Sequence, residues 1–153
     1  MLVPDVTYHQ SRLNHLSGQV IGAAIEVHRE LGPGLLESVY GLCLLEELRN
    51  RKIHVESQLA IPVSYKGRPL GKDLIVDIMV ENAVILELKA VEGVLPVHQA
   101  QLLSYLRLTG KPLGLLLNFH VSMMTKGITR IVNGRADVVA DFPESTGRKQ
   151  PRG

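Results

Sequence analysis

The sequence predicts an α/β domain in which a mixed β-sheet is flanked by helices. Apolar residues in about the first fifty positions recur at spacings of three and four, which is typical of helices. Segments with loose alternation and β-branched residues follow, and a further helical segment precedes a continuous apolar run. The predicted order of elements, α-α-β-β-β-α-β, gives a domain of two or three layers with a mixed sheet.

Two helices are predicted in the first third of the chain. The first runs from Asn14 to Leu31 and ends at Gly32-Pro33-Gly34, which cannot continue a helix. The second runs from about Leu35 to Arg51 and carries Glu37 in its first turn, where the helix dipole favours an acid. We expect the two helices to form an antiparallel or angled pair.

The pattern then changes to that of strands. Strands are predicted near 54 to 65, 70 to 80 and 83 to 89, and the first two are separated by a Lys66-Gly67 turn signal. Pro62 makes the first of these an edge strand or a bulged strand, because proline cannot donate to a sheet ladder.

The later elements are a helix and a buried strand. Pro96 is acceptable as a first helical residue, and the helix it begins is predicted to run until Gly110. LGLLLNF, residues 113 to 119, is consistent with a strand buried on both faces. The pattern beyond Phe119 is weaker, with a short last strand around Ile128 to Val132.

Length and charge indicate one domain with little overall charge. We expect residues 1–13 to form an N-terminal extension, 14–140 the folded domain and 141–153 a disordered basic tail. The 17 bases and 15 acids give a net charge of +2, and residues 144–153 hold three of the bases and one of the acids. The remainder balances, 14 against 14, so charge alone does not predict a strongly basic nucleic-acid surface.

The single cysteine and the N-terminus favour a cytoplasmic protein. Cys43 cannot form an internal disulfide and is expected to be a small buried hydrophobe. The N-terminus lacks a basic segment followed by an apolar one, and no apolar run reaches membrane-spanning length. We therefore expect a reducing cytoplasm and no membrane association.

Charged residues interrupt the apolar hairpin VDIMVENAVILELKA, residues 76 to 90. Glu87 and Lys89 are two apart in a strand and must share a face. The preceding strand is expected to have an apolar face opposite Asp77, and this face comprises Leu74, Val76, Ile78 and Val80. A loop of three residues, 81–83, aligns the apolar faces of both strands and places Asp77 opposite Glu87, with Asn82 able to adopt the left-handed conformation.

Two carboxylates that face each other repel, by roughly 0.2 to 1 kcal/mol even when exposed. Lys89 can neutralise one charge, but a divalent cation between Asp77 and Glu87 compensates both, because Mg²⁺ is usually held by one or two carboxylates together with water and phosphate oxygens. The alternative is an ordinary charged surface face.

Four segments give the chain a close resemblance to the bacterial GxxExxY proteins. They are GPGLLESVY at 32 to 40, Asp77, ELKA at 87 to 90 and HQAQLLSYL at 98 to 106. The resemblance covers about Leu16 to Phe119, and the family's name describes Gly34, Glu37 and Tyr40.

That family resembles a branch of the PD-(D/E)XK nuclease superfamily, which generally cuts phosphodiester bonds with Mg²⁺ or Mn²⁺. The resemblance implies a PD-(D/E)XK nuclease-like core within residues 14–140. It also implies a catalytic set of Glu37, Asp77, Glu87, Lys89, Gln101 and Tyr105. Asp77, Glu87 and Glu37 of this set would bind metal, while Gln101 and Tyr105 match a QxxxY element on one helical face. The superfamily's proline is replaced by Val76.

The resemblance therefore implies a nuclease whose partner is nucleic acid, with DNA favoured over RNA. A catalytically silent nucleic-acid or protein-binding module with the same fold is the alternative, and a homodimer or a protein partner is possible. The alternative for Glu37 is that it only complements the dipole at a helix N-terminus. The alternative for Gln101 and Tyr105 is that they are ordinary interface residues on an amphipathic helix. Tyr40 is expected to pack or hydrogen-bond near the site, and His28 and His98 to lie outside the metal site, because no zinc-ligand spacing links them.

Overall fold

The computed structural model describes residues 6–140, and its centre is a five-stranded mixed sheet with strand order β2-β3-β4-β5-β6. The strands are β2 (Val55–Tyr65), β3 (Arg68–Val80), β4 (Val84–Lys89), β5 (Leu113–Asn118) and β6 (Ile128–Val132). β4 and β5 are parallel, and the other neighbouring strands are antiparallel. The prediction of an α/β fold with a mixed sheet is confirmed.

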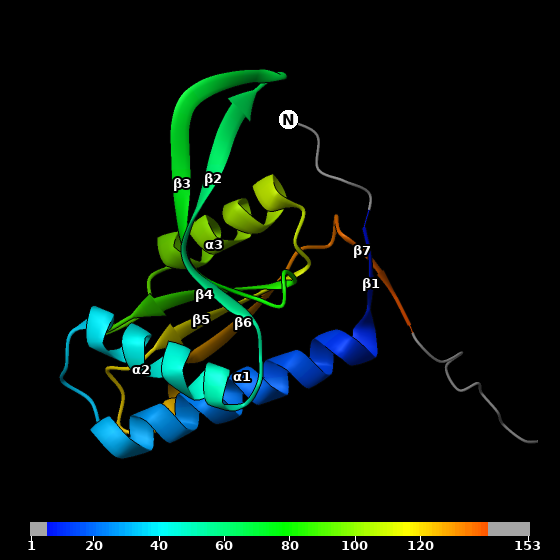
Figure 1. Cartoon of the computed structure of the whole chain (residues 1–153). Coiled ribbons are helices and arrows are strands. Elements are labelled where there is room, and N and C mark those ends of the chain that lie inside the picture. The colour runs from blue at the N-terminus through cyan, green and yellow to red at the C-terminus, as the bar shows by residue number, and fades with distance from the viewer. Residues whose placement is uncertain (1–5, 141–153) are drawn as a thin grey trace, which may run out of the picture.

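Helices cover both faces of the sheet, which gives three layers (Figure 1). α1 (Gln10–Leu31) and α2 (Glu37–Asn50) lie on one face, where their leucines and valines form the larger core cluster with β4 and β5. α3 (Pro96–Thr109) lies on the other face, where Leu102 and Leu106 pack against Ile85 and Leu116. α1 begins four residues before the predicted start at Asn14.

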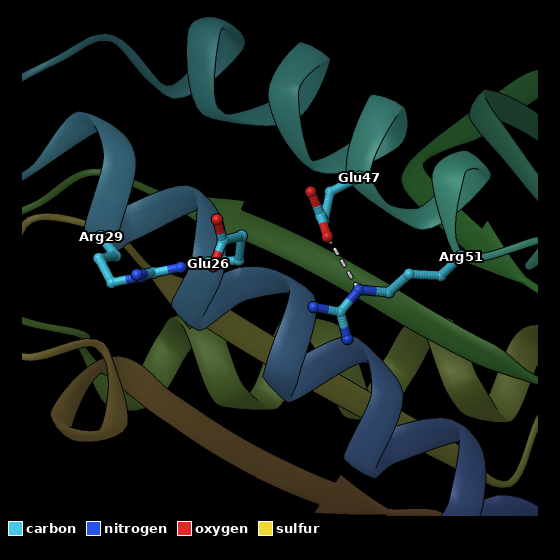
Figure 2. Close-up of polar contacts among 4 residues, drawn as sticks. All are labelled: Glu26, Arg29, Glu47 and Arg51. Atoms are coloured by element: carbon cyan, nitrogen blue, oxygen red, sulfur yellow. Dashed lines mark hydrogen bonds and ion pairs between the residues drawn. The ribbon is translucent and has the colours of Figure 1, made fainter.

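α1 and α2 pack against each other, and Arg51 lies between them (Figure 2). The Arg51 Nε atom is 2.9 Å from Glu47 Oε2, while Glu26 and Arg29 form an ion pair on α1. Gly22 of α1 leaves room for the Arg51 guanidinium, since a Cβ at this position would lie 3.0 Å from Arg51 Nη1. The expected pairing of the first two helices is thus present in the structure.

The strand features that the sequence predicted are also present. Every residue of β5 is buried, as expected for LGLLLNF. β2 is an edge strand with a register shift between Pro62 and Ser64, and β6 coincides with the short strand predicted at Ile128 to Val132. Lys66 and Gly67 form the turn between β2 and β3, both with positive φ.

A second, two-stranded sheet was not predicted. β1 (Thr7–His9) pairs in parallel with β7 (Asp137–Val139), and η1 (Met124–Gly127) is a short 3₁₀ helix. Three-residue strands are too short to show a periodicity in the sequence. The predicted disordered tail, 141–153, lies outside the described residues. No helix within residues 6–140 combines the length and apolar character needed to cross a membrane.

The apolar faces of β2 and β3 exchange sides in mid-strand, which corrects one prediction. Ile78 and Val80 pack in the core beneath α1 and α2, but Val76 packs in the cluster beneath α3. The partner strand changes in the same way, because Leu59 also joins the α3 cluster, and Gln58 just before it has φ of 51°. Val76 therefore does not share one apolar face with Ile78 and Val80.

Candidate active site at the fork between two strands

The site lies where β3 and β4 stop pairing. Their ladder contains Ile78 opposite Leu86, Met79 opposite Ile85, and Val80 opposite Val84, with the three-residue loop 81–83 between the strands. Glu81 and Asn82 both have left-handed backbone conformations, with φ of 49° and 53°. The predicted loop and register are confirmed, and the next pair in this register is Asp77 and Glu87.

Asp77 and Glu87 bind the backbone of each other's strands in place of further ladder bonds. The Leu88 N–H donates to Asp77 Oδ2 at 2.8 Å. The Asp77 N–H donates to Glu87 Oε1 at 3.4 Å. These contacts bring the two carboxylates into one fork, so they do not point to opposite faces of the hairpin.

Burial and mutual repulsion make both acids harder to ionise. Burial and the nearby charge of Asp77 raise the pKa of Glu87 to about 7. The hydrogen bond from the Asp77 N–H and the charge of Lys89 lower this pKa, but by less. Burial also raises the pKa of Asp77, whereas the Leu88 N–H and the charge of Lys89 lower it. A positive charge placed between these acids would therefore be strongly favoured.

Glu37 faces the same fork from the first residue of α2. Burial and the charge of Asp77 raise the pKa of Glu37, and Lys89 lowers it. The helical acid predicted upstream is thus electrostatically coupled to the strand acids and is not an isolated helix-terminus charge.

Tyr40 fixes the loop that carries Glu37. Its ring is fully buried and stacks on Phe119, with centroids 4.5 Å apart. Its hydroxyl donates to the Gly32 carbonyl and accepts the Leu35 N–H at 3.1 Å. Tyr40 therefore packs and hydrogen-bonds beside the site, as predicted, and closes the Gly-Pro-Gly turn that precedes α2.

α3 contributes Gln101 and Tyr105 from one helical face. The Gln101 side-chain amide donates to Tyr105 Oη at 3.1 Å. Burial and the negative charges of Glu87 and Asp77 raise the pKa of Tyr105, which places the phenol close to the carboxylates. Gln101 is exposed, and its contact to the site runs through Tyr105.

Asn118, which was not among the predicted site residues, positions the chain immediately after Lys89. It pairs with Lys89 across β4 and β5 and is buried. Its side chain accepts the Val91 N–H at 3.0 Å and donates to the Val91 carbonyl at 3.0 Å. The Phe119 N–H also donates to the Lys89 carbonyl. The signal for Asn118 in the sequence was a polar residue at the end of an otherwise apolar strand.

A cavity of about 350 Å³ lies beside the carboxylates, between α2 and the sheet. Glu37, Asp77 and Gln58 line it together with apolar residues of α2 and β4. Gln58 was not predicted, and its positive φ, uncommon for a residue other than glycine, is not visible in the sequence. The cavity gives solvent and ligands access to the acids.

The acids suit a hard divalent cation, although they do not form a complete cage. Carboxylate oxygens are the ligands that Mg²⁺ and Mn²⁺ prefer, and one or two of them with water suffice for Mg²⁺. Within residues 6–140, no three His, Cys, Asp or Glu side chains converge closely enough to hold a metal ion. The residues therefore fit a cation held by two carboxylates and completed by water or substrate oxygens.

The two histidines excluded from the metal site have structural contacts. His28 Nε2 lies 2.7 Å from the Val121 carbonyl, and His98 Nδ1 accepts the Leu95 N–H at 3.0 Å at the start of α3. Neither contact involves the carboxylates.

Comparison with known proteins identifies the class. The family model for the PD-(D/E)XK nuclease superfamily matches residues 14–131, and the chain belongs to this superfamily. No curated protein matches the chain. A similar solved structure is the crystal structure of SSO0001, with 15% identity, coverage of 95% of this chain and 73% of that chain, and a TM-score of 0.44. This structural likeness is too low to carry an argument.

Proposed function

We propose that the protein is a metal-dependent nuclease that hydrolyses phosphodiester bonds of DNA, with RNA the less favoured substrate. Membership of the superfamily supports nuclease-type function. The observation that carries the proposal is the fork, where the Leu88 N–H binds the Asp77 carboxylate and the Asp77 N–H binds the Glu87 carboxylate although the two acids repel. Within the superfamily, we propose the GxxExxY branch, on the residues Gly34, Glu37 and Tyr40.

Asp77 and Glu87 would hold Mg²⁺ or Mn²⁺, and Glu37, which does not converge with them closely enough to complete a three-acid cage, would face the ion from α2 as the third acid of the set. Such a cation lowers the pKa of a bound water and neutralises charge that develops on the phosphate. Lys89 brings a positive charge beside the carboxylates, where it can orient the attacking water, accept its proton or stabilise the transition state. Gln101 and Tyr105 would position the phosphate or the water through hydrogen bonds.

A silent nucleic-acid or protein-binding module is the second candidate. It is favoured by the lack of a three-residue metal cluster within residues 6–140. The enzyme is the stronger proposal because a silent domain has no need for acids that repel in a partly buried fork.

The test is incubation of the purified protein with labelled single- and double-stranded DNA and RNA in Mg²⁺, Mn²⁺ or EDTA. We expect metal-dependent cleavage of DNA that Asp77→Ala and Lys89→Ala each lower about 100-fold or more. Lys126→Ala, which removes an exposed lysine of η1, is the charge-matched control and should cleave normally. Cleavage that survives both site substitutions would come from a contaminant and would leave the binding module as the function.

A further inference from the structure

The hairpin between β2 and β3 forms an exposed basic arm. Every residue from 65 to 73 is exposed, and this hairpin arm extends away from the sheet and bends above α3 (Figure 1). It carries Lys66, Arg68 and Lys72 against a single acid, Asp73. Tyr65, which is 62% exposed, pairs with Arg68 at the tip. The local charge is thus positive, although the chain as a whole is nearly balanced.

A cleft of about 440 Å³ lies between the base of the hairpin arm and the C-terminal end of α3. Its apolar lining includes Leu59, Ile61 and Met79, and its polar lining includes Arg107 and Lys111. Among the described residues, no aspartate or glutamate lines this cleft. It lies on the face of the sheet that carries α3, the helix that also brings Tyr105 to the carboxylates.

The cations of the cleft and the arm have no acid partners among residues 6–140. Within the described residues, no ion pair involves Lys66, Arg68, Lys72, Arg107 or Lys111, whereas Arg12, Arg29 and Arg51 are each paired with a glutamate. Lys111 is partly buried, donates to Tyr8 Oη at 3.4 Å, and has a pKa lowered by burial. A partly buried cation without an acid favours binding of an anion.

We propose that the cleft and the hairpin arm bind a single-stranded segment of the DNA substrate. The inference rests on the proposed function, which it deepens by naming the form of the substrate. An apolar floor for bases, cations for phosphates and an exposed aromatic ring for stacking are the parts of a single-strand binding groove. The cleft has the volume of a small-ligand site, which accommodates a nucleotide and is too small for a duplex.

The length of the hairpin arm also indicates how long a DNA strand must be to contact both the fork and the tip. Asp77 and Arg68 lie on the same strand, nine residues apart (77 − 68), so the tip lies up to roughly 30 Å from the carboxylates at about 3.3 Å per residue. At the rise of about 3.4 Å per nucleotide of a stacked duplex strand, the distance from the fork to the tip corresponds to at most roughly nine nucleotides, and an extended single strand covers it with fewer. A short oligonucleotide would reach the fork without contacting Arg68.

The experiment measures fluorescence anisotropy of a labelled 20-nucleotide oligothymidine and of a blunt 20-base-pair duplex, in EDTA over a range of salt. Arg68→Glu and Arg107→Glu change exposed residues of the arm and the cleft. Lys126→Glu makes the same change of charge at an exposed residue of η1, which packs against α1. Melting temperatures of all three variants verify that they fold.

We expect Arg68→Glu and Arg107→Glu each to weaken binding of the oligothymidine about tenfold, and to lower the slope of log affinity against log salt by about 0.7 for each phosphate that is no longer neutralised. Lys126→Glu should change the affinity less than twofold, and binding of the duplex should be affected little by any of the three substitutions. Equal effects of all three substitutions, or unchanged binding of the oligothymidine by Arg68→Glu and Arg107→Glu, would overturn the proposal.

Binding and cleavage measurements together distinguish a failure of the single-strand groove from a failure of the proposed nuclease activity. Binding in EDTA requires no cleavage, so the anisotropy measurement tests the groove separately from the catalytic residues. Arm-dependent binding without cleavage would refute the nuclease and retain the groove. Cleavage that is insensitive to Arg68→Glu and Arg107→Glu on long single-stranded substrates would refute the groove and retain the nuclease.

Discussion

The Asp77 and Glu87 side chains exchange hydrogen bonds with the backbone of the opposite strand, through Leu88 N–H to Asp77 Oδ2 at 2.8 Å and Asp77 N–H to Glu87 Oε1 at 3.4 Å. The fork therefore supplies donors to both acids before any cation binds. These donors offset only part of the burial that raises the pKa of each carboxyl.

Replacing Glu87 by glutamine should stabilise the protein at high pH. The pKa of Glu87 is raised to about 7 from its ordinary 4.5, so the folded state binds more protons than the unfolded state between these values, and stability falls as pH rises through them. The advantage of Glu87→Gln should therefore appear above pH 4.5 and reach about 3 kcal/mol by pH 8, because each unit of pKa difference corresponds to about 1.4 kcal/mol. Urea denaturation across this range measures the difference.

The control for that prediction is Glu46→Gln, which changes an exposed glutamate of α2. Its free energy of unfolding should parallel that of the unmodified protein at every pH. A Glu87→Gln curve that also runs parallel would show that the fork does not hold a strained carboxyl.

Millimolar Mn²⁺ should raise the melting temperature at pH 8, because a cation between Asp77 and Glu87 removes their repulsion. At about 100 times the dissociation constant, binding contributes roughly 2.7 kcal/mol, or about 5 to 10 °C for a chain of this size. The increase should be much smaller at pH 5, where Glu87 is protonated and competes with the metal. An equal increase in Asp77→Asn would place the bound metal elsewhere.

Tyr40→Phe should destabilise the protein by about 1 to 3 kcal/mol, because the Gly32 carbonyl and the Leu35 N–H lose their shared partner. The ring can still stack on Phe119. DNA cleavage should fall as well, because Glu37 follows the loop that this hydroxyl closes. Tyr40→Leu, which also loses the stacked ring, should melt at a lower temperature than Tyr40→Phe. Unchanged melting of Tyr40→Phe would contradict the role of the hydroxyl.

Gln58→Gly should be more stable than Gln58→Ala by about 1 kcal/mol, because alanine keeps the strain of a positive φ and glycine does not. The matched pair at Glu56, an exposed position of β2 without positive φ, should show the reverse order. Urea denaturation of the four variants compares both positions. The same order at both positions would mean that the left-handed conformation at Gln58 stores no strain.

Local rules were enough to predict most of the sheet and its hairpin register. The acids of β3 and β4 could be aligned because one register alone buries both apolar faces, and the loop 81–83 has the length that this register requires. Pro62 and the continuous apolar run of β5 were equally informative. These signals depend on residues close together in sequence.

The exchange of faces at Gln58 depends on contacts that the sequence does not show. Strict alternation put Val76 with Ile78, but the strands change sides next to the left-handed residue Gln58, and Val76 packs beneath α3. The same change brings Gln58 to the cavity beside Asp77. Asn118 was missed for a related reason, since its partner Val91 lies 27 residues away.

The pairing of β1 with β7 joins the two ends of the described chain, Thr7–His9 to Asp137–Val139. A protein trimmed at either end would leave the other strand without its neighbour. Deleting both strands should therefore be scarcely more harmful than deleting one, because each truncation already breaks the same pairing. The limits of the family match, 14–131, exclude both strands and make poor boundaries for a recombinant fragment.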